Sequence, residues 1–189
     1  MTQHLTFILL VLSTCRMAWT EEPSPRYFGV RPGALAEAKA RLAGGDPSLQ
    51  PALENLVKEA DEALQTAPPS VMQKSKTPPS GDKHDYLSVA PYFWPDPARS
   101  NGLPYVRHDG KVNPESRDGA FDHGRVRLMA STVETLALGY YFTGKEAYAE
   151  HAARCLRVWF LDSATRMNPG FLLSTHMNRP PPTEVSWPR

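Results

Sequence analysis

The chain has 189 residues, of which 41% are hydrophobic and 22% charged, and its formal net charge is +1. This balance gives no long-range attraction to nucleic acid or to an anionic membrane surface. A binding function must therefore come from local clusters of side chains.

The N-terminal residues have the character of an export signal. An apolar run over 5–12 is too short to span a bilayer, and Ala18 is a small residue near a suitable cleavage position, so we expect 1–20 to be a signal peptide. The sequence LSTC ending at Cys15 is also similar to a bacterial lipoprotein signal, although no Lys or Arg precedes the apolar run. Both alternatives predict a secreted or periplasmic protein without a transmembrane span.

Two helices are predicted in the first third of the chain. The first begins at Pro32, which suits a first helical position, and runs to about Ala43, where two glycines end it. Asp46 and Pro47 open the second helix, which continues to about Gln65. The apolar face of this second helix consists of Leu49, Leu53, Leu56, Val57, Ala60 and Leu64.

Two more helices are predicted after residue 121. Apolar side chains recur with helical spacing over 122–142, and Gly144 marks the end of this helix. Thr143 and Glu146 have the pattern of a capping box for the next helix, which extends to about Leu161. So short a turn predicts an antiparallel hairpin. The expected apolar stripe of the first of these helices is Val126, Met129, Ala130, Val133, Ala137, Tyr140 and Tyr141.

The second helix of this hairpin has an expected core side and an expected surface side. Trp159 and Phe160 are expected in the core, and Cys155 is expected to be a small buried hydrophobe. His151 and Arg154 are expected at the surface.

Between the two helix pairs, residues 66–121 show no sustained helical or strand period, although pattern alone leaves room for very short strands. Segments of this length are usually lids, binding loops or disordered. Disorder is disfavoured because disordered segments are poor in aromatic residues, and this one contains several. We therefore predict an ordered, functional loop. Its aromatic residues include Tyr86, Tyr92, Phe93, Trp94 and Tyr105.

Cationic side chains are spread among these aromatics, a combination that suits a polyanion whose units also have flat apolar faces. Single-stranded nucleic acid and an acidic polysaccharide would both use this combination. A solvated loop that happens to be basic is a third alternative, because six acidic residues offset much of the charge. The cations are Lys74, Lys76, Lys83, His84, Arg99, Arg107, His108, Lys111 and Arg117.

The chain lacks the common motifs for metals and cofactors. It has no His pair at i, i+4, no CxxC, no Gly-rich phosphate loop and no G-x-S-x-G elbow. We therefore expect neither a metal nor a cofactor.

Three segments carry a family resemblance. They read, in order, SGDKHDYLSVAPYFWPDP, NGLPYVRHDGKVNPES and LALGYYFTGKEAYAEHAARCLRVWFLDSATRMNP. Together they resemble the N-terminal half of the alginate lyase superfamily domain, which we place at 27–169. The resemblance implies an all-α fold, a partial (α/α) toroid of helical hairpins with one long lid-like loop. It also implies β-elimination on a uronic-acid polymer such as alginate, and no nucleic acid partner.

β-Elimination requires a cation or donors on the substrate carboxylate, a base for the adjacent proton and an acid for the leaving oxygen. Lys83, His84 and Tyr86 are the candidate catalytic and substrate-binding residues, since they cluster in one part of the loop. For Lys83 and His84 the alternative is local hydrogen bonding in a turn. For Tyr86 the alternative is simple packing.

Three further residues of the loop are candidate substrate contacts. Tyr92 and Trp94 could stack on a sugar ring or fill the core of the loop. Arg107 is the candidate carboxylate clamp, because guanidinium can bind a carboxylate in bidentate fashion.

One departure from the family limits this interpretation. The resemblance implies a catalytic Asn-His pair, yet no Asn-His dipeptide occurs in the chain, and the proline-rich segment 170–189 is expected to be irregular. The sequence therefore suggests a lyase that is truncated before its catalytic pair. The alternatives are a noncatalytic remnant that binds acidic carbohydrate and an unrelated helical interaction protein.

Overall fold

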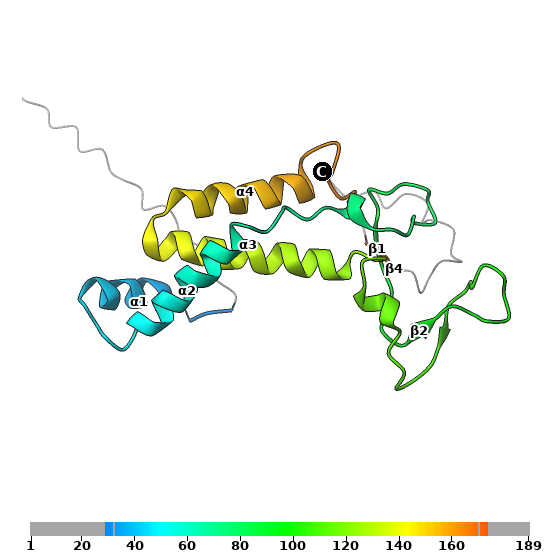
Figure 1. Ribbon diagram of the computed structural model, residues 1–189, viewed down its shortest axis with the longest axis horizontal. Coiled ribbons are helices and arrows are strands. Elements are labelled where there is room, and N and C mark those ends of the chain that lie inside the picture. Colours follow the sequence, from blue (N-terminus) through cyan, green and yellow to red (C-terminus); the bar gives the residue numbers. More distant parts are fainter. Residues whose placement is uncertain (1–28, 32, 170, 174–189) are drawn as a thin grey trace, which may run out of the picture.

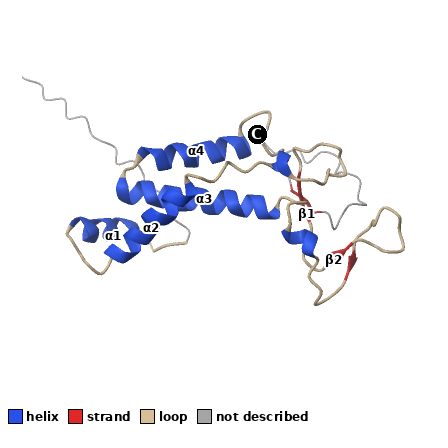
Figure 2. Ribbon diagram, in the orientation of Figure 1, coloured by secondary structure: helices blue, strands red, loops and turns tan. Residues whose placement is uncertain are grey.

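The computed structural model describes residues 29–31, 33–169 and 171–173. Helices dominate it, which confirms the all-α fold class, while the arrangement as a partial toroid stays a prediction (Figures 1 and 2). The predicted signal segment 1–20 and residues 174–189 of the expected tail lie outside the described residues. The helices are α1 (Ala34–Ala43), α2 (Gln50–Ala63), α3 (His123–Thr143) and α4 (Glu146–Phe160).

All four predicted helices are confirmed, and the largest shift is at the start of α2. The sequence places this start at Asp46-Pro47, whereas the helix begins at Gln50. The Asp46 carboxylate accepts hydrogen bonds from the backbone N–H and the hydroxyl of Ser48, at 2.9 and 2.7 Å. These bonds stabilise a turn in place of a first helical turn.

The helices α3 and α4 lie side by side as a hairpin, and α2 crosses α3 (Figure 1). Gly144 ends α3 with φ 72°, and its N–H donates to the carbonyl oxygen of Tyr140 at 2.7 Å. The predicted capping box is wrong. The Thr143 hydroxyl donates to Gly139 O within its own helix, and α4 has Lys145 at its N-cap position without a side-chain cap.

The helical core contains fewer residues of α3 than the predicted apolar stripe. Its buried residues on this helix are Met129, Thr132, Leu136 and Gly139, whereas Ala130, Ala137 and Tyr140 are exposed. Gly139 has no side chain, so α3 can approach α2 and α4 closely along this line. The three helices α2, α3 and α4 pack together through Ala60, Leu136, Tyr148 and Ala152.

On α4 three expectations are confirmed, one of them the exposed position of Arg154, and two are wrong. Cys155 and Trp159 are buried, at 0% and 1% exposure. His151 is buried too, because it lies on the same helical stripe, and its Nε2 is 2.9 Å from the carbonyl oxygen of Thr66. Phe160 is 47% exposed, since one further residue along the helix turns it away from that stripe.

The loop 66–121 is built from very short elements at the end of the molecule opposite α1 (Figure 2). It also has a small core of its own, made of Leu87, Val89, Tyr105, Ala120 and Phe121. Its 3₁₀ turns are η1 (Val71–Gln73) and η2 (Pro114–Arg117), and its strands are β1 (Tyr86–Ser88), β2 (Phe93–Trp94) and β3 (Val106–Arg107).

Strand pairing ties this loop to the far end of the described chain. β1 pairs in parallel with β4 (Phe171–Leu173), which lies at the start of the segment expected to be irregular. β2 and β3 form an antiparallel hairpin. None of the helices in the described part of the chain has both the length and the apolar character needed to cross a bilayer.

Candidate functional site

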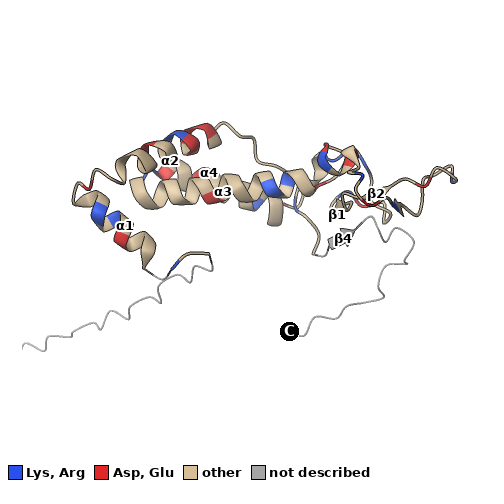
Figure 3. Ribbon diagram, turned by 90° about the horizontal axis from the view of Figure 1, so that it is seen from below, with Lys and Arg blue, Asp and Glu red and all other residues tan. Residues whose placement is uncertain are grey.

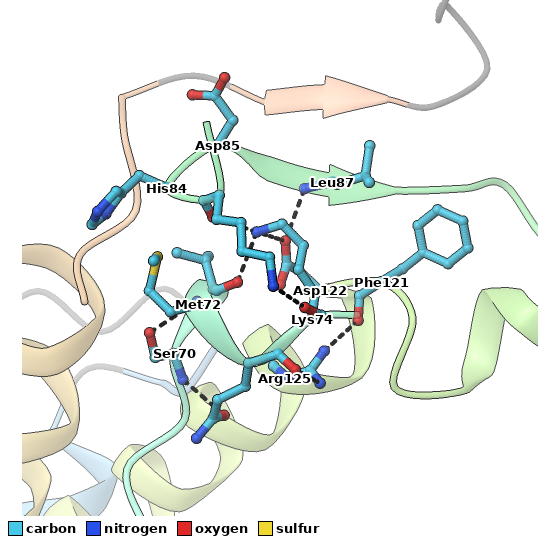
Figure 4. Close-up of polar contacts among 12 residues, drawn as sticks. Ser70, Met72, Lys74, His84, Asp85, Leu87, Phe121, Asp122 and Arg125 are labelled. Atoms are coloured by element: carbon cyan, nitrogen blue, oxygen red, sulfur yellow. Dashed lines mark hydrogen bonds and ion pairs between the residues drawn. The ribbon is translucent and has the colours of Figure 1, made fainter. Parts of the chain in front are cut away.

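A buried ion pair supports the part of the loop where the first candidates lie (Figure 4). Lys74 Nζ is 3.0 Å from Asp122 Oδ2, and neither side chain is exposed. The ammonium also donates to the carbonyl oxygens of Val71 and Lys83, at 2.7 and 2.6 Å. Burial raises the pKa of the Asp122 carboxyl and lowers the pKa of Lys74. Lys74 is therefore a structural residue, and its place among the polyanion-binding cations was wrong.

Two of the three predicted catalytic candidates are partly or wholly engaged inside the fold. Lys83 is half-buried, and its Nζ donates to the carbonyl oxygen of Lys74 at 3.2 Å. Tyr86 is 6% exposed and packs against Val71, Met129 and Trp159. Burial raises the pKa of its phenol. For Tyr86 this geometry favours packing over contact with a substrate.

The third candidate, His84, lies in a turn that is hydrogen-bonded to the segment 166–168. Its ring Nδ1 is 2.7 Å from the carbonyl oxygen of Arg166, and its own carbonyl oxygen accepts from the N–H of Asn168 at 2.9 Å. In Figure 4 the ring is directed away from the buried ion pair. We call the contacting residues 82–85 and 166–168 the His84 clasp.

Asn168 bridges two carboxylates of the His84 clasp. Its Nδ2 is 2.9 Å from Asp82 Oδ2 and 2.9 Å from Asp85 Oδ1. The backbone N–H of His84 and the Asn168 amide hold the pKa of Asp82 below its ordinary value. Sequence reasoning missed Asn168 as a site residue, although it lies within the third family-like segment, TRMNP.

The remaining candidates lie on the β2–β3 hairpin, on opposite faces of it. Phe93 pairs with Arg107 and Trp94 with Val106. Directly paired side chains share a face and successive ones alternate, so Tyr92 and Trp94 share one face while Arg107 lies on the other. The sequence grouped these three residues, and the register separates them.

Tyr92 and Trp94 form the aromatic face of the hairpin. Tyr92 is 42% exposed. Trp94 is half-buried, and its indole N–H donates to the carbonyl oxygen of Lys111 at 2.9 Å, which fixes the ring. A fixed, partly exposed indole beside an exposed phenol is suited to stacking on a sugar ring.

Arg107 is exposed on the opposite face of the hairpin. Its Nε donates to Asp109 Oδ1 at 2.6 Å, and the two side chains are 65% and 74% exposed. Because the pair is so exposed, it contributes little to stability, and a carboxylate from solution can compete for the guanidinium.

Several other polar residues of the loop serve its structure. Lys76 Nζ contacts Glu115 and the Tyr105 hydroxyl, both at 2.7 Å. Asn113 is 1% exposed, and its amide bonds to the backbone of Phe93 and Glu115. In Figure 3 both basic and acidic positions occur along the ribbon at this end of the molecule.

Neither surface is arranged as a metal site. Within the described ranges, no group of three or more His, Cys, Asp or Glu side chains could hold a metal ion. What the His84 clasp and the hairpin offer is a histidine, partly exposed cations and an aromatic face, which are groups that bind sugars and carboxylates.

Comparison with known proteins agrees with this chemistry. The alginate lyase family matches residues 70–178. A solved structure of an alginate lyase from Bacteroides ovatus is 49% identical, with a TM-score of 0.63, over 71% of this chain and 34% of that one. The chain thus spans about a third of the length of that solved structure. No curated protein matches it. Because the family match covers more than half of its residues, this chain belongs to the alginate lyase family.

Proposed function

We propose that this chain binds a uronic-acid-containing polysaccharide such as alginate through the loop 66–121, and that it serves a β-elimination reaction on that polymer. The observation that carries the proposal is the aromatic face of Tyr92 and Trp94, within a chain of the alginate lyase family. The mainly helical fold and the solved alginate lyase similar to it support the same class of substrate.

The candidate residues have different roles in binding, according to their positions in the loop. Tyr92 and Trp94 stack on the sugar rings, where the apolar faces of a pyranose can be buried. Lys83 and, from the opposite face of the hairpin, Arg107 supply positive charge for uronate carboxylates. Positive charge beside the carboxylate of the reacting unit also stabilises the enolate-like transition state of elimination. Tyr86 has no part in this proposal, because it is buried in the core.

A second candidate function is binding without catalysis. It is favoured by the absence of an Asn-His dipeptide from the 189 residues. A polymeric substrate would also be met outside the cytoplasm, in keeping with the export predicted from 1–20. Those residues lie outside the described part of the structure.

The test measures binding and elimination separately. The full chain is titrated with polyuronates of defined length by calorimetry, and formation of the unsaturated product is followed by ultraviolet absorbance. We expect binding that is weakened about tenfold, equal to about 1.4 kcal/mol, by Tyr92→Ala, Trp94→Ala or Arg107→Ala. Product formation would support the lyase, and binding without product would support the noncatalytic alternative.

Matched controls are present in the chain. Tyr140, at 38% exposure, is the control for Tyr92 at 42%. Arg31 is paired with Glu37 at the surface, as Arg107 is with Asp109, and is its control. Equal losses in control and test variants, or no binding of any polyuronate, would defeat the proposal.

A further inference from the structure

The orientation of His84 determines which of its ring nitrogens carries the proton. Nδ1 lies 2.7 Å from the carbonyl oxygen of Arg166. A carbonyl oxygen only accepts hydrogen bonds, so Nδ1 must donate. In the neutral ring Nε2 is then unprotonated, and it can accept a hydrogen bond but cannot donate one. Within the described part of the chain, no hydrogen-bond partner is found for Nε2.

The His84 clasp holds this residue at three points. Besides the ring contact, the His84 N–H donates to Asp82 Oδ1 at 2.8 Å, and the His84 carbonyl accepts from Asn168 N–H at 2.9 Å. The backbone N–H, the backbone carbonyl and the ring of His84 are thus each held by a hydrogen bond. The carbonyl that selects the tautomer belongs to the segment 166–168, which is more than 80 positions away in the sequence.

Asn168 keeps the two segments in register. Its side-chain amide has two N–H donors, and it reaches one carboxylate oxygen of Asp82 and one of Asp85, each at 2.9 Å. A neutral residue with two donors can join two carboxylates without adding charge. Because Arg166 lies only two residues before Asn168, the position of Asn168 determines where the Arg166 carbonyl lies.

We propose that Asn168 is a positioning residue that fixes His84 as its Nδ1–H tautomer, so that Nε2 acts as a hydrogen-bond acceptor for a hydroxyl of a bound uronate polymer. The last clause rests on the proposed function. It assigns a hydroxyl to His84 and leaves the carboxylates to Lys83 and Arg107. A histidine donating to a carboxylate would need the other tautomer or a positive charge.

The chain provides an internal reference with the opposite tautomer. His151 has its Nε2 2.9 Å from the carbonyl oxygen of Thr66, so it must be protonated at Nε2. Two histidines in one molecule are therefore expected to give opposite patterns in long-range ¹H–¹⁵N correlation spectra. The measurement is made on the full chain at a pH about 2 units above the ordinary histidine pKa of about 6.5. Loss of one pattern in His84→Gln assigns the signal.

We expect His84 to be protonated at Nδ1 and His151 at Nε2. An Nε2–H pattern for His84 in the unaltered chain, or an even mixture, would overturn the tautomer assignment. Asn168→Ala should shift His84 toward the mixture of a solvent-exposed histidine and leave His151 unchanged. Asn55→Ala is the matched control, because Asn55 also donates its amide to a carboxylate, that of Glu59. An unchanged His84 in Asn168→Ala would overturn the positioning role.

Addition of oligouronate separates this inference from the proposed function. We expect the Nε2 resonance of His84 to move and that of His151 to stay. If no resonance of the chain responds to oligouronate, the proposed function fails, while the tautomer is decided by the spectra of the free chain. If Tyr92 and Trp94 respond and His84 does not, binding stands and the acceptor role is overturned.

Discussion

Lys74 and Asp122 form an ion pair whose two side chains are completely buried, with Nζ 3.0 Å from Oδ2. The same carboxylate accepts the N–H of Leu87, the central residue of β1, at 2.9 Å. One ion pair thus joins the turn η1, strand β1 and the start of α3, and it lies under the turn that contains His84. The geometry of the candidate site depends on it.

Removing one partner of this pair should be costly. Lys74→Met leaves the Asp122 carboxylate buried without its cation, which typically destabilises a protein by about 3–5 kcal/mol. Urea denaturation of the full chain measures this change. Lys58→Met is the control, because Lys58 is exposed on α2 and should change stability by less than about 0.5 kcal/mol.

The double variant Lys74→Met/Asp122→Leu distinguishes an uncompensated charge from lost packing. With both charges gone, part of the stability should return, since apolar replacements of buried ion pairs are often neutral. The recovery is limited because the Leu87 N–H loses its acceptor. A double variant as unstable as Lys74→Met alone would contradict this explanation.

Sequence periodicity was sufficient for α3 and α4, because each buries a stripe that repeats every three to four residues. α1 has no buried residue, and its prediction came from Pro32 and the two glycines that follow the helix. The same logic could not find Lys74. A lysine among polar residues of an irregular loop has the pattern of a surface cation. Its burial depends on the ion pair with Asp122, which lies 48 positions later in the sequence. His151 was misplaced for a similar reason, since its polarity outweighed its position on the buried stripe of α4.

The two-residue strands β2 and β3 show why the site was only partly predictable. A strand of two residues is too short to show an alternating pattern in the sequence. Only the pairing of Phe93 with Arg107 shows that Arg107 and Trp94 lie on opposite faces of the hairpin. The His84 clasp also depends on contacts between positions far apart, which a single sequence does not contain.

The crossing of α3 with its neighbours depends on Gly139. A Cβ at this position would lie 3.0 Å from Ala60 Cβ and 3.0 Å from Tyr148 Cδ2, so these neighbours would have to give way by a few tenths of an ångström. Gly139→Ala should therefore destabilise the chain by about 1–3 kcal/mol, as overpacking commonly does. Thermal or urea denaturation measures it.

Gly124 is the matched control in the same helix, because a Cβ there would meet nothing within 4 Å. Gly124→Ala should leave stability unchanged or raise it by up to about 1 kcal/mol, since alanine favours the helix. Destabilisation of the same size in both variants would argue against a packing cause.

Cys155 should be chemically inert in the folded chain. The residue is fully buried, and burial raises the pKa of its thiol, so little thiolate is present or accessible. In a Cys15→Ser background, iodoacetamide should label Cys155 only at the rate at which the protein opens. Ala147→Cys in a Cys15→Ser/Cys155→Ser chain should label rapidly, because Ala147 is exposed on the same helix. Equal labelling rates would show that this part of the core is open.

The turn between α1 and α2 should contribute to acid stability through Asp46. The side-chain hydroxyl and backbone N–H of Ser48, together with Arg41, lower the pKa of Asp46 from 3.8 to about 2. Because the folded-state pKa lies below the unfolded value, the carboxylate stabilises the fold above pH 3.8, and this contribution is lost as the pH falls through about 2.

Carboxyl NMR titration should give that midpoint, and Ser48→Ala should raise it toward 3.8, since the largest cause is removed. Ser131→Ala, which removes a hydroxyl from α3, should leave the midpoint unchanged. A Ser48→Ala midpoint that stays near 2 would assign the shift to the backbone N–H of residue 48 and to Arg41 instead.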